Sequence, residues 1–266
     1  MIRQATGQKD PIIALLRELS TEDGRKRTGR FFAEGEEIVK RAFDYGGGVH
    51  FLIVTERFSS NPKCAKLAER AQCAGAEIVT ATEGLLAKVL EAKPTPECIA
   101  IVERKTAALA DILNSPSALI LMVEHGENAD NLGMLLRSTD ASGLDGAILA
   151  SDTTDPFARR VVRGSRGAVF TTPICIQHSA IKTVEAAKKA GLQVVATSAQ
   201  SDLSFTSVDF TVPTMIVVGN EHVGISDELR SQADTIAKIP MHGKINSLNI
   251  AVAGSVVLYE ALRQRE

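Results

Sequence analysis

Three polar loops follow apolar runs in the second half of the chain, and each carries residues that could bind a small polar molecule. The loops read EHGENADNLG at residues 124–133, GNEHVGISDEL at 219–229 and MHGKINSLN at 241–249. Glycine permits close backbone approach, while Asn and Ser can cap a helix or hydrogen-bond a ligand. Helix capping is the simpler interpretation of each loop alone. Three together indicate a ligand pocket, and the absence of G-x-G-x-x-G or G-x-x-x-x-G-K-[ST] argues against an ordinary dinucleotide site or P-loop.

The elements around these loops predict how they are positioned. Apolar runs typical of buried parallel strands alternate with segments of helical periodicity, and the final helix reads NIAVAGSVVLYEALRQ at 249–264. The expected strands are ALILMVEHG (118–126), DGAILAS (145–151), LQVVATSA (192–199) and TMIVVGNE (214–221); the expected helices between them are 131–143 and 180–191. In an open parallel sheet, ligands bind outside the carboxyl ends of the strands, where the polar loops would lie.

The first half predicts a separate, smaller α/β domain. Helical spacing in PIIALLREL (11–19), EGEEIVKRAFDYG (34–46) and KCAKLAERAQCAG (63–75) alternates with strand patterns in 49–58 and 76–82. The segment ERKTAALADILNSPSA contains charge and a Ser-Pro-Ser, which favours a boundary. We therefore expect an N-terminal domain over 1–105, a linker over 106–117 and a second domain over 118–266.

Composition excludes several classes of protein. The 266 residues carry a formal net charge of −2, and no apolar run reaches the length of a membrane-spanning helix. The N-terminus has no apolar core of a secretory signal, and the four cysteines form no C-x-x-C pair, so a reducing cytoplasm is expected. His125, His222 and His242 lie in the polar loops without the fixed spacing of metal ligands, so we expect no metal.

Nucleic-acid binding would have to come from local clusters of basic residues, because the net charge of the whole chain is close to zero. One basic cluster lies in the first half and a second lies between the polar loops. The clusters are Arg25, Lys26, Arg27 and Arg30, and Arg159, Arg160, Arg163 and Arg166. Phosphate contacts are largely charge-driven, so RNA binding is one interpretation and a solvated loop is the other.

The polar loops resemble, in order and context, the three signature motifs of the SpoU (TrmH-like) family of RNA ribose 2′-O-methyltransferases in the SPOUT superfamily. ENADNLGMLLRSTDASG resembles the first, IVVGNEHVGIS the second, and IPMHGKINSLN with its following helix the third. VRGSRGAVFTTPI also resembles a family segment between motifs one and two. LLRELSTEDGRKRTGRFFAEGEEIVKRAF resembles the family's accessory substrate-binding domain, which has a ribosomal-protein-like α/β fold.

The resemblance implies a parallel-sheet α/β domain whose C-terminal segment forms a deep trefoil knot, an exception to the usual avoidance of knots. It implies S-adenosylmethionine as methyl donor, contacted by Gly219, Ile239 and Leu248. It implies a homodimer acting on RNA, with phosphate contacts from Arg25, Lys26, Arg27, Arg30 and Arg166.

For the chemistry, the resemblance makes Arg137 the residue closest to the reacting hydroxyl. It could take the hydroxyl proton, or bind a neighbouring phosphate and orient the hydroxyl; the second role is physically easier because a free arginine stays protonated. Asn131, Glu221, Ser247 and Asn249 would orient the ribose and organise the loops, although both asparagines could be helix caps and Glu221 could be structural.

The sequence departs from the family pattern at several positions, including Ala129 where proline is frequent, but no proposed catalytic position is lost. Ribosomal RNA is the expected substrate because of the separate N-terminal domain. Transfer RNA, or a non-catalytic role in RNA binding and assembly, are the alternatives.

Overall fold

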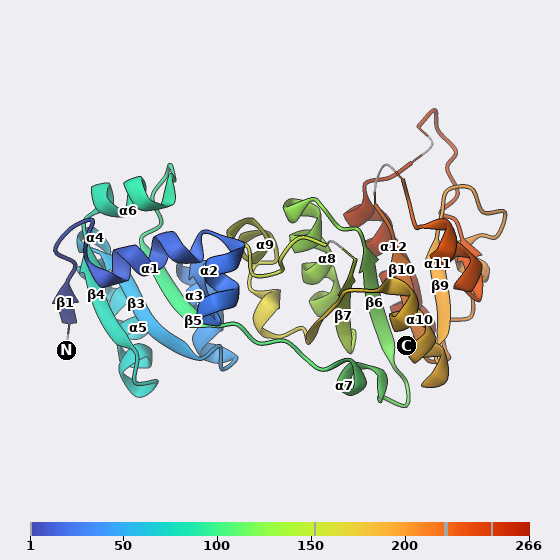
Figure 1. Cartoon of the computed structure of the whole chain (residues 1–266), viewed down its shortest axis with the longest axis horizontal. Helices are drawn as coiled ribbons and strands as arrows, with labels where there is room; N and C mark the ends of the chain where they lie inside the picture. Colours follow the sequence, from blue (N-terminus) through green and yellow to red (C-terminus); the bar gives the residue numbers. More distant parts are fainter. Residues whose placement is uncertain (1, 152, 221–222, 246) are drawn as a thin grey trace. The chain divides into compact units, whose positions relative to one another are not determined.

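The computed structural model describes residues 2–151, 153–220, 223–245 and 247–266. The chain forms two compact units (Figure 1). The N-terminal unit comprises residues 1–104 together with 155–171, and the C-terminal unit comprises 105–154 together with 172–266. Within the described part of the chain, no helix is both long and apolar enough to cross a membrane.

The N-terminal unit is built on a mixed sheet of five strands in the order β1-β4-β3-β5-β2. Strands β1, β4 and β3 are parallel, whereas β5 runs antiparallel to both β3 and β2. The strands are β1 (Ile2–Gln4), β2 (Arg30–Glu34), β3 (Val49–Thr55), β4 (Glu77–Ala81) and β5 (Cys98–Glu103). The helices are α1 (Pro11–Leu19), α2 (Glu22–Thr28), α3 (Glu36–Asp44), α4 (Glu56–Ser59), α5 (Pro62–Cys73), α6 (Glu83–Leu90) and α9 (Arg159–Gly164), with a 3₁₀ turn at Ala168–Phe170. The α/β character expected for the first half is confirmed.

Local sequence accounts for most of these helices. Helix α1 begins after Asp10, whose carboxylate accepts a hydrogen bond from the Ile12 amide, and Pro11 occupies the first turn, where a missing amide hydrogen costs nothing. The basic stretch at residues 25–27 is not a loop but the end of α2, which Thr21 caps and which stops at Gly29 in a left-handed conformation.

The segment 155–171 packs within the N-terminal unit, although it follows the first polar loop by more than twenty residues. Phe157 and Phe170 both pack against Phe31 of β2, with their ring centroids 4.9 and 5.8 Å from that of Phe31; the Phe157 ring is tilted and the Phe170 ring is stacked. Asp155 pairs with Arg25 at 2.6 Å, and both side chains are almost fully buried. The N-terminal unit is therefore formed by two separate stretches of sequence. The expected boundary at residues 106–117 instead treats each domain as one continuous stretch.

The C-terminal unit holds a six-stranded sheet in the order β11-β9-β10-β6-β7-β8, with every pairing parallel. The strands are β6 (Leu119–Glu124), β7 (Gly146–Ala150), β8 (Ile174–Gln177), β9 (Gln193–Thr197), β10 (Thr214–Val218) and β11 (Thr235–Ala237). The helices are α7 (Leu109–Leu113), α8 (Ala129–Ala141), α10 (Ala180–Lys189), α11 (Asp227–Gln232) and α12 (Ile250–Arg265), with a 3₁₀ turn at Phe205–Ser207. The expected parallel sheet is confirmed.

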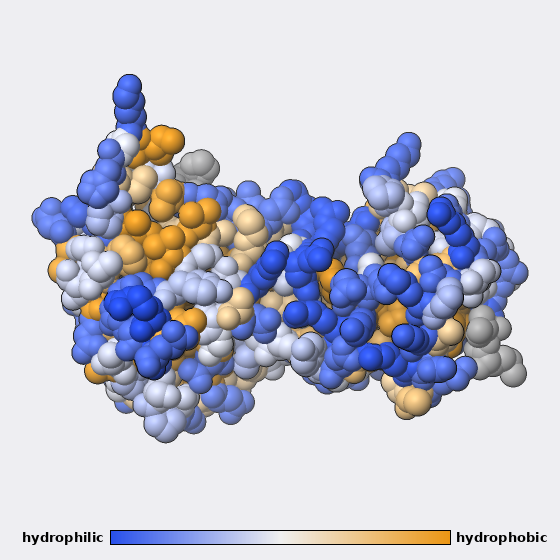
Figure 2. All heavy atoms as spheres, turned by 180° about the vertical axis from the view of Figure 1, so that it is seen from behind, coloured by the Kyte–Doolittle hydropathy of each residue, from blue (hydrophilic) through white to orange (hydrophobic). Residues whose placement is uncertain are grey.

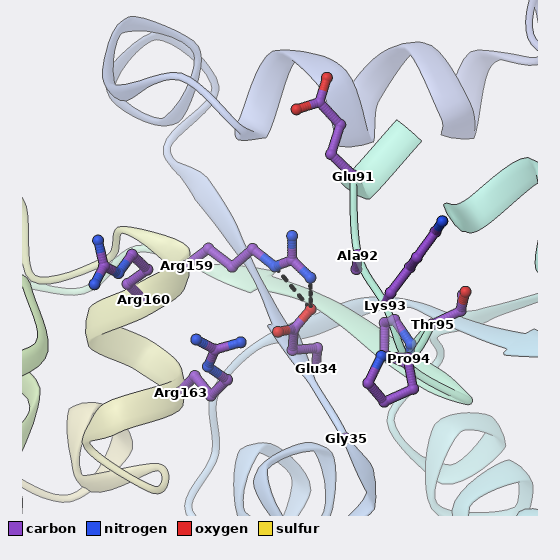
Figure 3. A pocket seen from close by; sticks show the side chains of 11 residues that line it. Glu34, Gly35, Glu91, Ala92, Lys93, Pro94, Thr95, Arg159, Arg160 and Arg163 are labelled. Atoms are coloured by element: carbon purple, nitrogen blue, oxygen red, sulfur yellow. Dashed lines mark hydrogen bonds and ion pairs between the residues drawn. The ribbon is translucent and has the colours of Figure 1, made fainter. Parts of the chain in front are cut away.

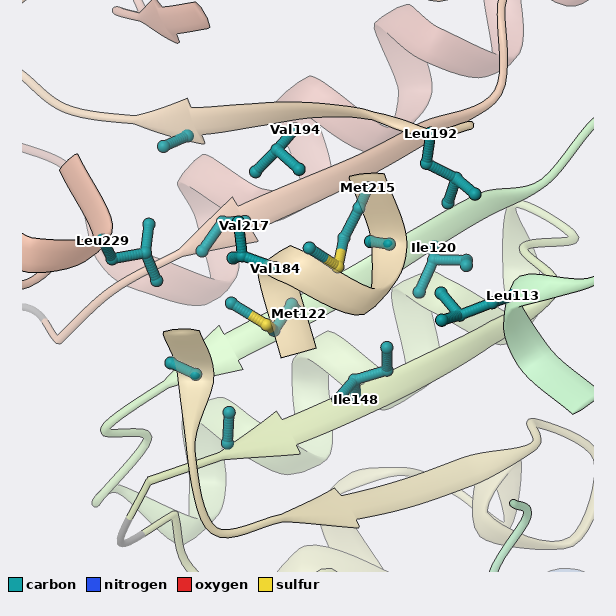
Figure 4. Close-up of a cluster of buried hydrophobic side chains, with 14 of the residues drawn as sticks. Leu113, Ile120, Met122, Ile148, Val184, Leu192, Val194, Met215, Val217 and Leu229 are labelled. Carbon is teal, nitrogen blue, oxygen red and sulfur yellow. The ribbon is translucent and has the colours of Figure 1, made fainter. Parts of the chain in front are cut away.

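Helices cover both faces of this sheet. On one face, Ile120, Met122 and Val217 belong to a buried cluster with side chains of α7, α10 and α11 (Figure 4). On the other face, α8 packs against α12, where Gly254 allows close contact: a β-carbon there would lie 2.5 Å from Leu135. Burial on both faces explains why these strands read as continuous apolar runs.

Candidate active site at the strand ends of the C-terminal unit

The carboxyl ends of the two central strands bring the first two polar loops together. Strands β6 and β10 are neighbours, with Val123 opposite Val218, so the loops that begin at Glu124 and Gly219 leave the sheet side by side. The third loop follows β11, two strands away across β9. Parallel pairing thus places all three loops at one edge of the sheet, as the sequence predicts.

A buried carboxylate joins the first loop to the second. Glu124 is only 2 % exposed, and it accepts hydrogen bonds from the Ser226 amide (2.8 Å) and hydroxyl (2.7 Å). The Ser226 hydroxyl also accepts from the Leu229 amide and so caps α11. Because removing a partner from a buried charge is costly, this pair holds the end of β6 and the start of α11 together.

In the second loop, Asn220 and Gly224 are held together by their backbones. Asn220 and Gly224 exchange both backbone hydrogen bonds, at 3.0 and 2.8 Å, and Gly224 has a φ of +73°. A β-carbon on Gly219 would overlap the Gly224 carbonyl group and the Ile225 amide nitrogen. The Asn220 side chain donates to the His125 carbonyl at 3.3 Å and so connects the second loop to the first.

The first and third loops meet through two asparagines. The Asn249 side-chain amide donates to Asn131 Oδ1 at 2.9 Å, across 118 residues of sequence. Asn249 is also the N-cap of α12, accepting from the Ala251 amide at 2.9 Å. Asn131 is not a cap: it lies in the first turn of α8, 7 % exposed, and Asn128 caps that helix instead. One of the two asparagines therefore has the capping role considered for both.

Arg137 lies in the second half of α8 on the exposed surface. Among the described residues, its guanidinium makes no hydrogen bond or ion pair. Met134, one turn earlier, is 43 % exposed on the same side of the helix. The structure does not bring Arg137 into contact with Asn131 or Asn249, so its charge is available to a molecule that binds from outside.

The remaining site candidates lie in or beside the loops and are exposed or half-buried. Ser247 and Leu248 precede α12 and are exposed, Ile239 is half-buried after β11, and Gly219 is half-buried after β10. Glu221 lies outside the described residues. Over the part of the chain that is described, no three His, Cys, Asp or Glu side chains gather in a way that could hold a metal ion.

The proposed RNA-contacting residues differ in how far they are buried. Arg25 is buried and held by Asp155 and the Leu19 carbonyl, so its charge stabilises the fold instead of facing solvent. Lys26 and Arg27 are exposed and form surface ion pairs, with Glu22 at 2.6 Å and Glu18 at 3.0 Å. Arg30 is half-buried at the start of β2, and Arg166 is exposed after α9.

Replacement of Asn249 by aspartate should separate its capping role from its contact with Asn131. Aspartate keeps the oxygen that caps α12 but loses the donor to Asn131 Oδ1, so we expect a loss of about 1–3 kcal/mol in the free energy of unfolding. Asn128→Asp is the matched control, because Asn128 caps α8 through its oxygen in the same way; it should stay within about 0.5 kcal/mol of wild type. Urea denaturation of the three proteins measures the difference, and equal stabilities would contradict the assigned bond.

Sequence reasoning missed Glu124, Ser226, Asn128 and Asn220 as residues that organise the loops. Glu124 carried a signal that could have been used, since it is a charged residue at the end of a run that is otherwise apolar. Its partner Ser226 could not be identified without the fold, because 102 residues separate them.

Comparisons with known proteins agree with this geometry. Residues 118–259 match the model of the SpoU rRNA Methylase family, and residues 10–100 match an MRM3-like substrate binding domain. The chain is 31 % identical to a 23S rRNA (uridine(2479)-2′-O)-methyltransferase from Streptomyces viridochromogenes, over 93 % of this chain and 87 % of that protein. It is 27 % identical to the 23S rRNA (guanosine(2553)-2′-O)-methyltransferase RlmP from Bacillus subtilis, over 97 % and 98 %.

Among solved structures, the AdoMet-bound rRNA methyltransferase from Sinorhizobium meliloti superposes with a TM-score of 0.89. The two share 29 % identity, and the match covers 98 % of each chain. The similarity therefore extends through both units and includes the three polar loops.

Proposed function

Because the chain belongs to the SpoU rRNA methylase family, we propose that it transfers a methyl group from S-adenosylmethionine to a ribose 2′-hydroxyl of ribosomal RNA. The observation that carries the proposal is the meeting of the three motif loops at one sheet edge, joined by the Asn249–Asn131 and Glu124–Ser226 contacts. The relatives named above act on ribosomal RNA, which favours that substrate over transfer RNA.

The described loops fit a methyl donor that is held by backbone groups. Gly219 leaves no room for a side chain, so main-chain atoms form the surface after β10. Ile239 and Leu248 would contribute apolar contacts, and Leu248 is 36 % exposed in the present structure. The resemblance also implies that the segment leading into α12 is threaded as a trefoil knot, which we include in the proposal.

The chemistry requires positioning more than acid catalysis. The bound donor supplies an electrophilic methyl group on sulfur and leaves as a neutral thioether, so its departure needs no proton. The protein must align the 2′-hydroxyl with that methyl group, and the hydroxyl proton passes to solvent water as the oxygen–methyl bond forms. Arg137 would bind the neighbouring phosphate and orient the hydroxyl, a role that suits the planar, cationic arginine side chain. Asn131, Ser247, Asn249 and Glu221 would orient the ribose and the loops.

A second copy of the chain is proposed as a partner. Val252, Val256 and Tyr259 recur along one side of α12 and are 48 %, 37 % and 49 % exposed. Figure 2 shows hydrophobic side chains gathered on one face of the C-terminal unit, at the left of that view. An apolar helix face of this kind suits packing against an identical helix in a homodimer.

The proposed RNA surface of the N-terminal unit includes Lys26, Arg27, Arg30 and Arg166. Lys26, Arg27 and Arg166 are exposed and Arg30 is half-buried, so phosphates can reach them. The ion pairs of Lys26 and Arg27 lie on the surface, where replacing the carboxylate partner by a phosphate costs little free energy. Arg25 is left out of this surface because of its buried pair with Asp155. We propose a cytoplasmic location, where such an RNA substrate would be found.

Incubation with labelled S-adenosylmethionine and separate pools of unmodified ribosomal and transfer RNA tests the proposal. Label should enter ribosomal RNA as a ribose methyl group, identified by mass spectrometry of nuclease digests. Label in transfer RNA alone would show that the substrate is transfer RNA and not ribosomal RNA. Absence of donor binding by calorimetry would favour a non-catalytic RNA-binding protein and contradict the proposal.

A further inference from the structure

The N-terminal unit contains a cavity of about 490 Å³ that lies within this unit and involves none of the motif loops (Figure 3). Three segments line it: the end of β2, the loop at residues 91–96 after α6, and helix α9. Its volume falls within the range of about 300–1,000 Å³ typical of small-ligand sites. Helix α9 belongs to the segment 155–171, so the cavity exists only because that segment packs on β2.

The lining is polar and carries more positive than negative charge. Its charged side chains are Arg159, Arg160, Arg163, Lys93, Glu34 and Glu91. In Figure 3, Arg159 and Arg163 extend from α9 toward Glu34, whereas the side chain of Lys93 extends from the facing loop away from Arg163, with the Arg159–Glu34 pair between them. Four cations against two carboxylates favour an anionic ligand.

One carboxylate is fixed in a defined orientation. Arg159 donates from Nε and Nη2 to the same oxygen of Glu34, Oε2, at 2.9 and 2.7 Å, and from Nη1 to the Leu90 carbonyl. Within the described part of the chain, Glu34 Oε1 accepts no hydrogen bond. The side chain of Glu34 is 10 % exposed, so this oxygen is a largely buried acceptor beside exposed cations.

This combination matches the chemistry of a nucleotide better than that of a free anion. Arg163 and Lys93 can each bind a phosphate, whereas Glu34 Oε1 would repel one and instead accepts from an N–H group such as those on base edges. The proline rings of Pro94 and Pro96 supply apolar surface for the base. RNA is read mainly through unpaired nucleotides whose base edges are accessible.

We propose that this cavity binds one unpaired nucleotide of the RNA substrate, its phosphate held by Arg163 and its base by Glu34, with Lys93 on the opposite side contacting the adjacent phosphate of the same strand. The inference rests on the proposed function for the identity of the RNA, but the site is distant in sequence from every motif loop. It assigns to the N-terminal unit a nucleotide pocket, in addition to the exposed basic surface at α2. The pocket would fix which part of the RNA the enzyme accepts.

Equilibrium binding of a fluorescein-labelled single-stranded RNA pentanucleotide to the full chain tests the site, with anisotropy read at several salt concentrations. Arg163→Ala and Lys93→Ala should each weaken binding by about tenfold or more. Each should also reduce the slope of log affinity against log salt by about 0.7, the loss of one phosphate contact on a single strand. Arg57→Ala, an exposed position on α4 outside the cavity, removes the same charge and should change neither value.

Competition distinguishes a nucleotide from a phosphate alone. A nucleoside 5′-monophosphate should displace the pentanucleotide at lower concentration than inorganic phosphate does; equal displacement would overturn the base contact. Calorimetry with S-adenosylmethionine should show wild-type donor affinity in Arg163→Ala, and thermal unfolding confirms that this variant is folded.

The outcomes for the pocket and for the enzyme can be read separately. If wild type methylates ribosomal RNA but Arg163→Ala and Lys93→Ala bind the pentanucleotide like wild type, the pocket is overturned and the proposed function stands. If the variants lose binding while no methyl transfer occurs in wild type, the pocket is supported and the proposed function fails.

Discussion

Arg137→Ala should lower ribose methylation by about 10²–10⁴-fold while leaving the affinity for S-adenosylmethionine unchanged. The range is that expected for loss of a positioned group acting on a proton or on the reacting hydroxyl. Arg137 is exposed on α8, so removing its side chain creates no cavity and should change the free energy of unfolding by less than about 0.5 kcal/mol. Single-turnover transfer of labelled methyl groups and calorimetry with the donor measure the two effects.

Two further variants are needed to interpret this result: one controls for the loss of a positive charge, and one tests whether the guanidinium itself is required. Lys189→Ala removes one exposed positive charge from the end of α10, which precedes β9 and lies at the opposite edge of the sheet, and should keep full activity. Arg137→Lys retains a positive charge but not the planar guanidinium with its paired N–H donors. Partial recovery by lysine would support a phosphate contact. A variant Arg137→Ala with wild-type transfer would remove Arg137 from the mechanism.

The sequence predicted the architecture of the C-terminal unit because its signals are local. Buried parallel strands read as continuous apolar runs, and helix starts carry Asn or Ser at the cap, so both can be recognised without knowing their neighbours. The shortest strands were missed because they are too short to carry such a local signal. Strands β1, β8 and β11 have three or four residues, too few for any period to appear.

Contacts between distant segments could not be predicted from local patterns. The family match over residues 118–259 is continuous in sequence, yet residues 155–171 within it belong to the N-terminal unit. Only the folded chain shows that Asp155 neutralises Arg25 and that Phe157 packs on Phe31. A cluster of four basic residues at 25–30 therefore contains one whose charge stabilises the fold, and the sequence does not distinguish it from the others.

In the candidate site too, the sequence motifs identify residues but not the contacts between them. The motifs identified Asn131 and Asn249, but their hydrogen bond depends on α8 packing against α12 through Gly254. Asn128 and Asn131 are three residues apart and both suit a helix start, so which of them caps α8 is decided by the backbone path out of β6.

Gly219→Ala should weaken donor binding at least tenfold although it adds only one methyl group. The φ of Gly219 is not in the left-handed region, so the expected defect is steric and not conformational. The added carbon would overlap main-chain atoms of Gly224 and Ile225, which cannot rotate away as a side chain could. Gly219 and Gly224 must then move apart, and the mutual hydrogen bonds of Asn220 and Gly224 must lengthen or break.

Overpacking of this kind costs about 1–3 kcal/mol, and because the strain falls on the loop proposed to hold the donor, we expect at least a tenfold loss of donor affinity. Gly84→Ala is the matched control: Gly84 lies in α6 with open space around its α-carbon, and alanine there should stabilise the helix by up to about 1 kcal/mol. Calorimetry with S-adenosylmethionine and urea denaturation compare the two variants. Wild-type donor affinity in Gly219→Ala would place the donor away from this loop, since no arrangement of the present backbone accepts the extra carbon without moving the loop.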